Sequence, residues 1–304
     1  MSFSSDVKQE LAGHMAKGRH CLTAELKAML DVSPIRFRMK DGEPEIILLQ
    51  TEIEAIARKF FTISDNTFNI GVFTSKEKRK GLDQGETYLI TIKDRATAAR
   101  LQNSVMAEDA VKRSCCQRSY FRGAFLAGGT ISDPNRYYNL EVVCSEEQAA
   151  DTLRAVLQEM GLPAKTIRRK NQSVVYIQEA DCIAEALRLM GANLALMEFE
   201  NIRIMREMRG SINRQVNCET ANLKKTINAA HRQIEDIQFL QENGGFDHLS
   251  PVLVRAAEIR LAYPDASLTE LGSFLNPPVG KSGMNHRLRK LQEAADILRA
   301  GGEL

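Results

Sequence analysis

The sequence predicts an α+β N-terminal region followed by an all-α C-terminal region. Over about the first 210 residues, short runs with strand-like alternation are interleaved with amphipathic helical runs. One order of elements, helix–strand–strand–helix–strand–strand–helix, occurs there twice. Beyond that region the apolar residues recur at helical spacing only. A chain of 304 residues is long enough for two domains with their own cores.

The first half of the α+β region spans about residues 1–112. Its predicted elements are a helix over 21–31, strands over 35–40 and 45–50, a helix over 52–61, strands over 68–74 and 87–93, and a helix over 95–105. A turn at Asp41-Gly42 joins the first two strands, because these residue types favour tight turns.

The second half spans about residues 113–210 and repeats this order. Its predicted elements are a helix over 118–127, strands over 129–133 and 138–144, a helix over 146–160, strands over 164–169 and 174–178, and a helix over 181–190. The run Gly161-Leu162-Pro163 is a typical helix stop. Identity between the halves is low, so the repeat is one of elements.

The C-terminal part begins with a helical linker over residues 211–246. After a helical stretch over 194–208, Thr220 can cap a new helix that ends at Asn243-Gly244-Gly245. Its apolar stripe consists of Leu223, Ile227, Ala230, Ile234, Ile237 and Leu240. The next helix starts at Ser250-Pro251 and ends near Tyr263-Pro264.

Residues 247–304 have the pattern of a helix-turn-helix domain. Ser267 and Glu270 form a capping box that opens a helix over 268–275. The chain breaks at 276–280, and a final helix follows over 282–299. Its inner stripe consists of Met284, Leu288, Leu291, Ala295 and Leu298.

The opposite face of this last helix predicts DNA binding. Ser282, Asn285, His286 and Arg289 follow the spacing i, i+3, i+4, i+7, as in a recognition helix that enters the major groove. Asn and Arg can pair with adenine and guanine edges, while Lys281, Arg287 and Lys290 suit phosphates. The alternative is a small helical bundle with a charged exterior.

Local charge favours a polyanion partner more than the net charge of +2 does. Four basic blocks carry this interpretation. They are Lys76, Lys78, Arg79 and Lys80; Lys112, Arg113, Arg118 and Arg122; Lys165, Arg168, Arg169 and Lys170; and Lys281, Arg287, Arg289 and Lys290. Any one of them alone is more often solvated surface.

The remaining composition predicts a cytoplasmic protein without membrane span, metal or cofactor. No apolar run approaches the ~20 residues of a span, and the N-terminus lacks the pattern of a secretory signal. The cysteines, Cys21, Cys115, Cys116, Cys144, Cys182 and Cys218, are interpreted as reduced core residues. No C-x-x-C or H-x-x-x-H pair occurs, which argues against zinc.

Residues 123–131, Gly-Ala-Phe-Leu-Ala-Gly-Gly-Thr-Ile, resemble the LAGLIDADG motif of homing endonucleases. In that motif two helices pack through small residues, here Gly123, Ala127 and Gly128, and each ends in a metal-binding acid. The resemblance implies a saddle-shaped antiparallel sheet with pseudo-symmetric halves. Gly128 occupies the acid position, and a weaker first copy over 26–34 places Ser33 there. Glycine cannot bind a hard cation such as Mg²⁺.

The whole chain resembles the WhiA family of bacterial transcriptional regulators. The resemblance is most specific over 121–133, over 267–272 and over 278–291, with an arginine-rich join over 201–214. It implies a nucleoid-associated regulator of cell division, chromosome segregation and, in some lineages, sporulation, with a C-terminal domain similar to the promoter-reading domain of sigma factors. Double-stranded promoter DNA is the implied partner, with RNA polymerase, its sigma factor or another regulator as further candidates.

Two alternatives remain open at this stage. An active metal-dependent nuclease would need two acids at the base of the helix pair, and Asp31 and Asp133 are the local candidates. Asp133 precedes Pro134 and is more naturally a turn residue. The N-terminal region could also bind a protein or a small ligand instead of DNA.

Overall fold

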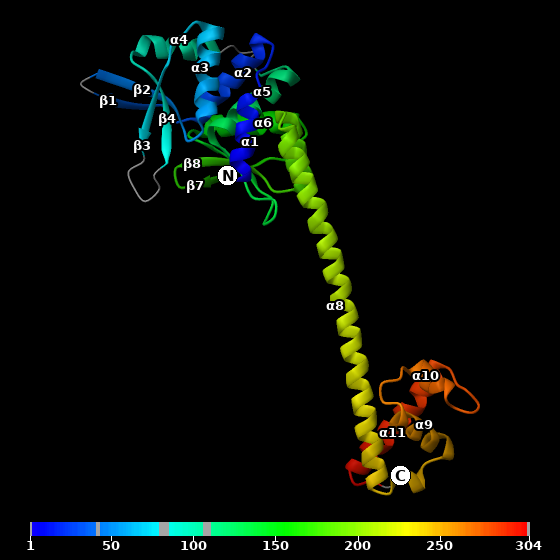
Figure 1. Cartoon of the computed structure of the whole chain (residues 1–304). Coiled ribbons are helices and arrows are strands. Elements are labelled where there is room, and N and C mark those ends of the chain that lie inside the picture. Colours follow the sequence, from blue (N-terminus) through cyan, green and yellow to red (C-terminus); the bar gives the residue numbers. More distant parts are fainter. Residues whose placement is uncertain (1, 41–42, 79–84, 106–110, 303–304) are drawn as a thin grey trace. The chain divides into compact units, whose positions relative to one another are not determined.

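The predicted repeat is present in the computed structural model, which describes residues 2–40, 43–78, 85–105 and 111–302. The chain divides into two units, Met1–Glu207 and Met208–Leu304. In the first unit the same order of elements occurs twice, after a helix α1 (Phe3–Gly13) that the sequence pattern did not predict (Figure 1).

The first copy has the elements α2 (Arg19–Val32), β1 (Arg36–Lys40), β2 (Glu43–Thr51), α3 (Glu54–Phe68), β3 (Phe73–Lys78), β4 (Glu86–Ile92) and α4 (Arg95–Val105). The turn predicted at 41–42 lies outside the described residues. A strand starting at residue 68 was wrong. Phe68 ends α3, Asn69 follows in the left-handed region with φ 52°, and β3 starts at Phe73. Ile70 and Val72 are buried. Because buried apolar residues at every second position are typical of a strand, this stretch was predicted as one.

The second copy has the elements α5 (Ser114–Gly128), β5 (Gly129–Ile131), β6 (Leu140–Cys144), α6 (Glu147–Glu159), β7 (Lys165–Arg169), β8 (Gln172–Ile177) and α7 (Ala180–Met190). The predicted stop after α6 is confirmed, since Gly161 adopts a φ of +82° that L-residues rarely take.

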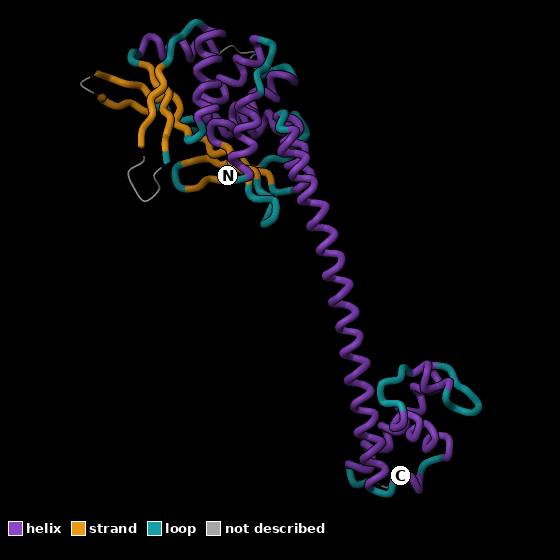
Figure 2. The backbone as a smooth tube through the Cα atoms, in the orientation of Figure 1, coloured by secondary structure: helices purple, strands orange, loops and turns teal. Residues whose placement is uncertain are grey.

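Among the described residues, the strands form two antiparallel four-stranded sheets of identical topology. Their orders are β1-β2-β4-β3 and β5-β6-β8-β7. In Figure 2 the strands of the first unit gather on one side and its helices on the other. Strand β6 alternates buried and half-buried residues along its length, as expected of a strand with one face on the core. The repeat of elements is therefore a repeat of fold.

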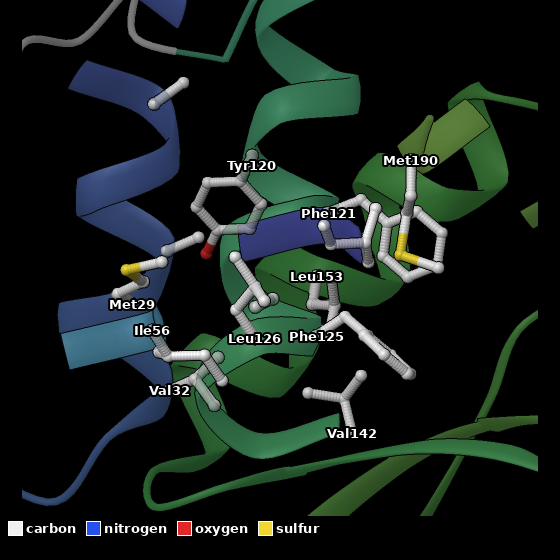
Figure 3. Close-up of a cluster of buried hydrophobic side chains, with 14 of the residues drawn as sticks. Met29, Val32, Ile56, Tyr120, Phe121, Phe125, Leu126, Val142, Leu153 and Met190 are labelled. Atoms are coloured by element: carbon white, nitrogen blue, oxygen red, sulfur yellow. The ribbon is translucent and has the colours of Figure 1, made fainter. Parts of the chain in front are cut away.

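Helices α2 and α5 pack directly against each other in the core of the first unit. A Cβ atom at Gly123 would lie 2.2 Å from the backbone oxygen of Glu25 and 3.1 Å from the Cβ of Ala28. Figure 3 shows aromatic side chains of α5, among them Tyr120 and Phe125, within this core. The close approach explains why the motif keeps small residues on this face of α5.

A buried ion cluster lies between the same helices. The carboxylate of Glu25 on α2 is 2.5 Å from Lys59 Nζ on α3 and 3.2 Å from Arg122 Nε on α5. Lys59 also donates to the carbonyl oxygens of Leu11 and His14 at 2.8 and 2.6 Å. The assignment of Arg122 to a basic surface block was therefore wrong, because its guanidinium is needed to satisfy a buried carboxylate.

The linker is part of a single long helix, α8 (Asn193–Glu242), within which one unit gives way to the other. A helix start at Thr220 was wrong. Neither Gly nor Pro occurs between residues 211 and 242, so nothing forces the chain out of the helical conformation there. The carboxylate of Glu10 accepts the backbone N–H groups of Leu194 and Ala195 at 2.8 and 2.9 Å and so caps the helix. Its predicted stop is confirmed by Gly244, whose φ is 71°.

The second unit has its own helical core. The end of α8 packs against η1 (Gly245–His248), α9 (Pro251–Ala262), α10 (Leu268–Ser273) and α11 (Lys281–Arg299). Ile237 and Leu240 are fully buried there, whereas Leu223 and Ile227 on the same predicted stripe are 61% and 55% exposed. Asp236 on α8 binds Arg299 on α11 with an N–O distance of 2.6 Å.

Candidate functional site

Local signals in the sequence position the last two helices. Ser267 N donates to Glu270 Oε2 at 2.8 Å, and Glu270 N donates to Ser267 Oγ at 3.3 Å. The predicted capping box is thus confirmed. The Ser267 backbone N–H holds the pKa of Glu270 below its usual value, because it binds the charged carboxylate.

The turn between α10 and α11 depends on a close backbone approach. Val279 N donates to Gly272 O at 2.9 Å. A Cβ atom at residue 272 would lie 2.2 Å from the oxygen of Val279, so a larger residue would push the turn away. The tilted rings of Tyr263 and Phe274 pack beside it with centroids 4.5 Å apart. These contacts set where α11 begins.

Helix α11 has two distinct faces. Met284, Leu288, Leu291 and Ala295 are buried, as the stripe predicted. The predicted contact residues lie on the other side. Lys281, Ser282, Asn285, His286, Arg289 and Lys290 are exposed, and Arg287 is half-buried. Their position on the surface is as expected, and their binding to DNA stays a prediction.

Most of these polar side chains are unengaged. Arg289 Nε lies 3.2 Å from Glu293 Oε1, an exposed pair one turn apart. Within residues 2–40, 43–78, 85–105 and 111–302, no side-chain hydrogen bond or ion pair holds Asn285, His286 or Lys290. Gly280, at the N-cap of α11, has no side chain to occupy the first N–H groups of the helix. That end is open to an anion.

The two motif positions meet at a cleft in the first unit. Ser33 at the end of α2 and Gly128 at the end of α5 both line a cleft of about 1040 Å³. A Cβ atom at Gly128 would lie 2.4 Å from the oxygen of Val143 and 2.6 Å from Val32 Cγ1. The motif acid is therefore absent, and the packing leaves no room for a side chain.

Cations contribute strongly to the lining of this cleft. Lys8, Arg36 and Arg58 line it, together with the carboxylates of Glu52 and Glu54. Glu54 is bound by Arg58 at 2.7 Å. Burial lowers the pKa of Lys8 to about 8, because a desolvated ammonium is disfavoured. Lys8 and Arg36 would repel a divalent cation here, whereas Glu52 and Glu54 would attract one.

The two acids considered for a nuclease have other partners. Asp31 binds Lys27 Nζ at 2.9 Å and accepts the hydroxyl of Tyr120 at 2.9 Å. Asp133 accepts the backbone and side-chain N–H groups of Asn135 at 2.9 and 3.0 Å. Asp133 is therefore a turn residue, as its sequence context favoured.

The basic blocks of the first unit have different environments. Lys165, Arg168, Arg169 and Lys170 are exposed on and after β7. Lys76 and Lys78 lie on β3, the equivalent edge strand, while Arg79 and Lys80 lie outside the described residues. Within the arginine-rich join, Arg206 donates to the oxygen of Pro134 at 2.5 Å. That arginine is used inside the first unit.

The cysteines are not all core residues. Cys115 and Cys218 are exposed, which corrects the sequence interpretation. Cys21, Cys115 and Cys116 gather around His20, with all four ligand atoms within 4.8 Å of one another. Burial and the neighbouring thiols raise the pKa of Cys116 to about 12. The spacing rules missed this group, because its members come from two adjacent pairs far apart in sequence.

Comparison with family models covers most of the chain. The WhiA N-terminal LAGLIDADG-like domain matches residues 19–104, and the WhiA LAGLIDADG-like domain matches 117–209. The WhiA C-terminal HTH domain matches residues 212–295. Among the helices of the described ranges, none is long and apolar enough to cross a bilayer.

Relatives and solved structures agree with the family models. The probable cell division protein WhiA of Lachnoclostridium phytofermentans is 43% identical to this chain. The match covers 98% of this chain and 100% of the relative. That of Heliobacterium modesticaldum is 41% identical, with 99% and 98% covered. The crystal structure of full-length WhiA from Thermatoga maritima is 27% identical, covers 97% of this chain and 98% of its own, and gives a TM-score of 0.61.

Proposed function

The chain belongs to the WhiA family, and we propose that it is a sequence-specific DNA-binding transcription regulator linked to cell division. The names of its relatives, probable cell division proteins, support this link. On the basis of the family resemblance we also propose roles in chromosome segregation and, in some lineages, sporulation. Promoter DNA is the partner, together with RNA polymerase, its sigma factor or another regulator.

The observation that carries the proposal is the exposed polar face at the start of α11. Four cations and no acid lie between Lys281 and Lys290, and the polar side chains project from a helix whose other face is anchored in the core. A rigid helix that exposes amide, imidazole and guanidinium groups fits the major groove.

Each group has a chemical role in this proposal. Asn285 pairs with an adenine edge, and Arg289 exchanges Glu293 for the acceptors of guanine. Lys281 and Lys290 bind phosphates, as do the first backbone N–H groups of α11. The exposed basic residues of β7 offer the first unit a further electrostatic contact.

The test compares variants of the full-length chain on a selected DNA site and on random DNA. Arg289→Ala should weaken specific binding by about 1–3 kcal/mol and random binding less. Lys290→Ala should weaken both alike and lower the slope of log K against log salt by about 1. Gln292→Ala, exposed on the same helix, is the matched control. Equal losses on both DNAs for Arg289→Ala would remove its assignment as a base-reading residue.

We further propose that the protein has no nuclease activity. The cleft at Ser33 and Gly128 supports this, because neither motif position carries the metal-binding acid. Supercoiled plasmid incubated with the protein and Mg²⁺ or Mn²⁺ should stay intact. Cleavage that disappears in Asp31→Asn would instead establish the alternative, a metal-dependent endonuclease.

A further inference from the structure

The ligand group at His20 lies at the N-terminal ends of the α2–α5 helix pair. Helix α2 starts at Arg19 and α5 at Ser114, so each helix contributes the second and third residues of its first turn. His20 and Cys115 are 95 residues apart, as are Cys21 and Cys116, and Ser33 and Gly128. The group therefore obeys the internal symmetry of the repeat, which an accidental cluster of thiols has no reason to do.

The distances within the group suit a tetrahedral metal site. His20 Nδ1 lies 3.2 Å from Cys116 Sγ, 3.3 Å from Cys21 Sγ and 4.0 Å from Cys115 Sγ. Around Zn²⁺, bonds of about 2.3 Å to sulfur and 2.0 Å to nitrogen place ligand atoms about 3.5–3.8 Å apart. Movements of less than about 1 Å would bring the four atoms into a Cys₃His shell.

The burial of the four ligand residues also fits a metal site. Cys21 and Cys116 are 8% and 1% exposed, while His20 and Cys115 are exposed. The site thus has two buried ligands on one side and two ligands that solvent can reach on the other. Among the described residues this is the one group of three or more potential ligands close enough to share an ion.

We infer that His20, Cys21, Cys115 and Cys116 form a structural zinc site that joins the N-terminal ends of α2 and α5. Four protein ligands leave no open position for a substrate, which is typical of structural and not catalytic zinc. The ion would hold together the two halves of the first unit at the end of the helix pair opposite the cleft.

Cobalt substitution tests this directly on the full-length chain. Metal-free, reduced protein is titrated with Co²⁺ and then with Zn²⁺, and bound zinc is counted by elemental analysis. One Co²⁺ per chain should give the intense visible bands of tetrahedral coordination and a sulfur-to-metal charge-transfer band, both lost on adding Zn²⁺. Zinc should also raise the Tm of the protein, because it binds the folded state.

Matched variants decide whether these residues are the ligands. Cys115→Ser, at an exposed position, should weaken zinc binding by roughly tenfold or more and remove the zinc-dependent rise in Tm. Cys218→Ser, at an exposed position outside the group, should behave as wild type. His20→Cys should keep the tetrahedral spectrum and strengthen the charge-transfer band. Wild type without a tetrahedral spectrum, equal affinity in Cys115→Ser, or a disulfide within the group in zinc-treated protein would each overturn the site.

Discussion

The two ends of the α2–α5 helix pair carry opposite chemistry. At the C-terminal ends, the positions of the motif acids hold Ser33 and Gly128, and Lys8 and Arg36 line the adjoining cleft. At the N-terminal ends, three thiols and an imidazole converge. The helix pair thus lacks metal ligands at its C-terminal ends, where the nuclease motif requires them. It carries potential metal ligands at its N-terminal ends, where the motif requires none.

This difference separates packing from chemistry. Residue 123 of α5 must be small because the backbone of α2 approaches it closely. Gly128, at the C-terminal end of α5, is likewise packed too closely for a side chain, so packing alone is enough to preserve these small residues. A motif can therefore persist for structural reasons after its catalytic residues are gone.

The middle of the pair should be the most sensitive to substitution. Glu25→Gln leaves Lys59 and Arg122 buried without a counter-charge. We expect the free energy of unfolding to fall by about 3–5 kcal/mol, measured by urea denaturation. Glu185→Gln breaks an exposed pair with Arg188 and should cost no more than about 0.5 kcal/mol. Equal losses in the two variants would show that the cluster does not hold the helices together.

The sequence predicted the order of elements because alternation and helical spacing are local properties. It predicted the capping box at Ser267 and the inner stripe of α11 for the same reason. The burial of Arg122 could not be predicted from the sequence, because the carboxylate that compensates its charge belongs to Glu25, 97 residues away. The group at His20 could not be predicted either, because the pairs His20-Cys21 and Cys115-Cys116 come together only when α2 and α5 pack.

The next largest effect is expected where the backbone of α2 approaches Gly123 of α5. Gly123→Ala places a methyl group against the backbone of α2, and backbone cannot move aside as a flexible side chain can. We expect a loss of about 2–3 kcal/mol in unfolding free energy. Gly210→Ala, in α8, meets only the end of the Arg214 side chain at 3.5 Å. It should instead gain up to about 1 kcal/mol from helix propensity. A neutral Gly123→Ala would mean that the helices can separate without cost.

The smallest effect is expected at the cleft, from Lys8. Its folded-state pKa of about 8 lies below the ordinary value of 10.5, so the unfolded chain binds the proton more tightly. Its burial therefore lowers stability below pH 8, and this penalty disappears as pH rises towards 10.5. Lys8→Met should raise the unfolding free energy by on the order of 1–2 kcal/mol at neutral pH, and by less at a pH of about 9.5. Lys17→Met, at an exposed position, should change stability by less than about 0.5 kcal/mol at either pH. Urea titrations at both pH values measure the unfolding free energies. A gain in Lys8→Met that does not shrink with rising pH would show that Lys8 is not a desolvated cation in this cleft.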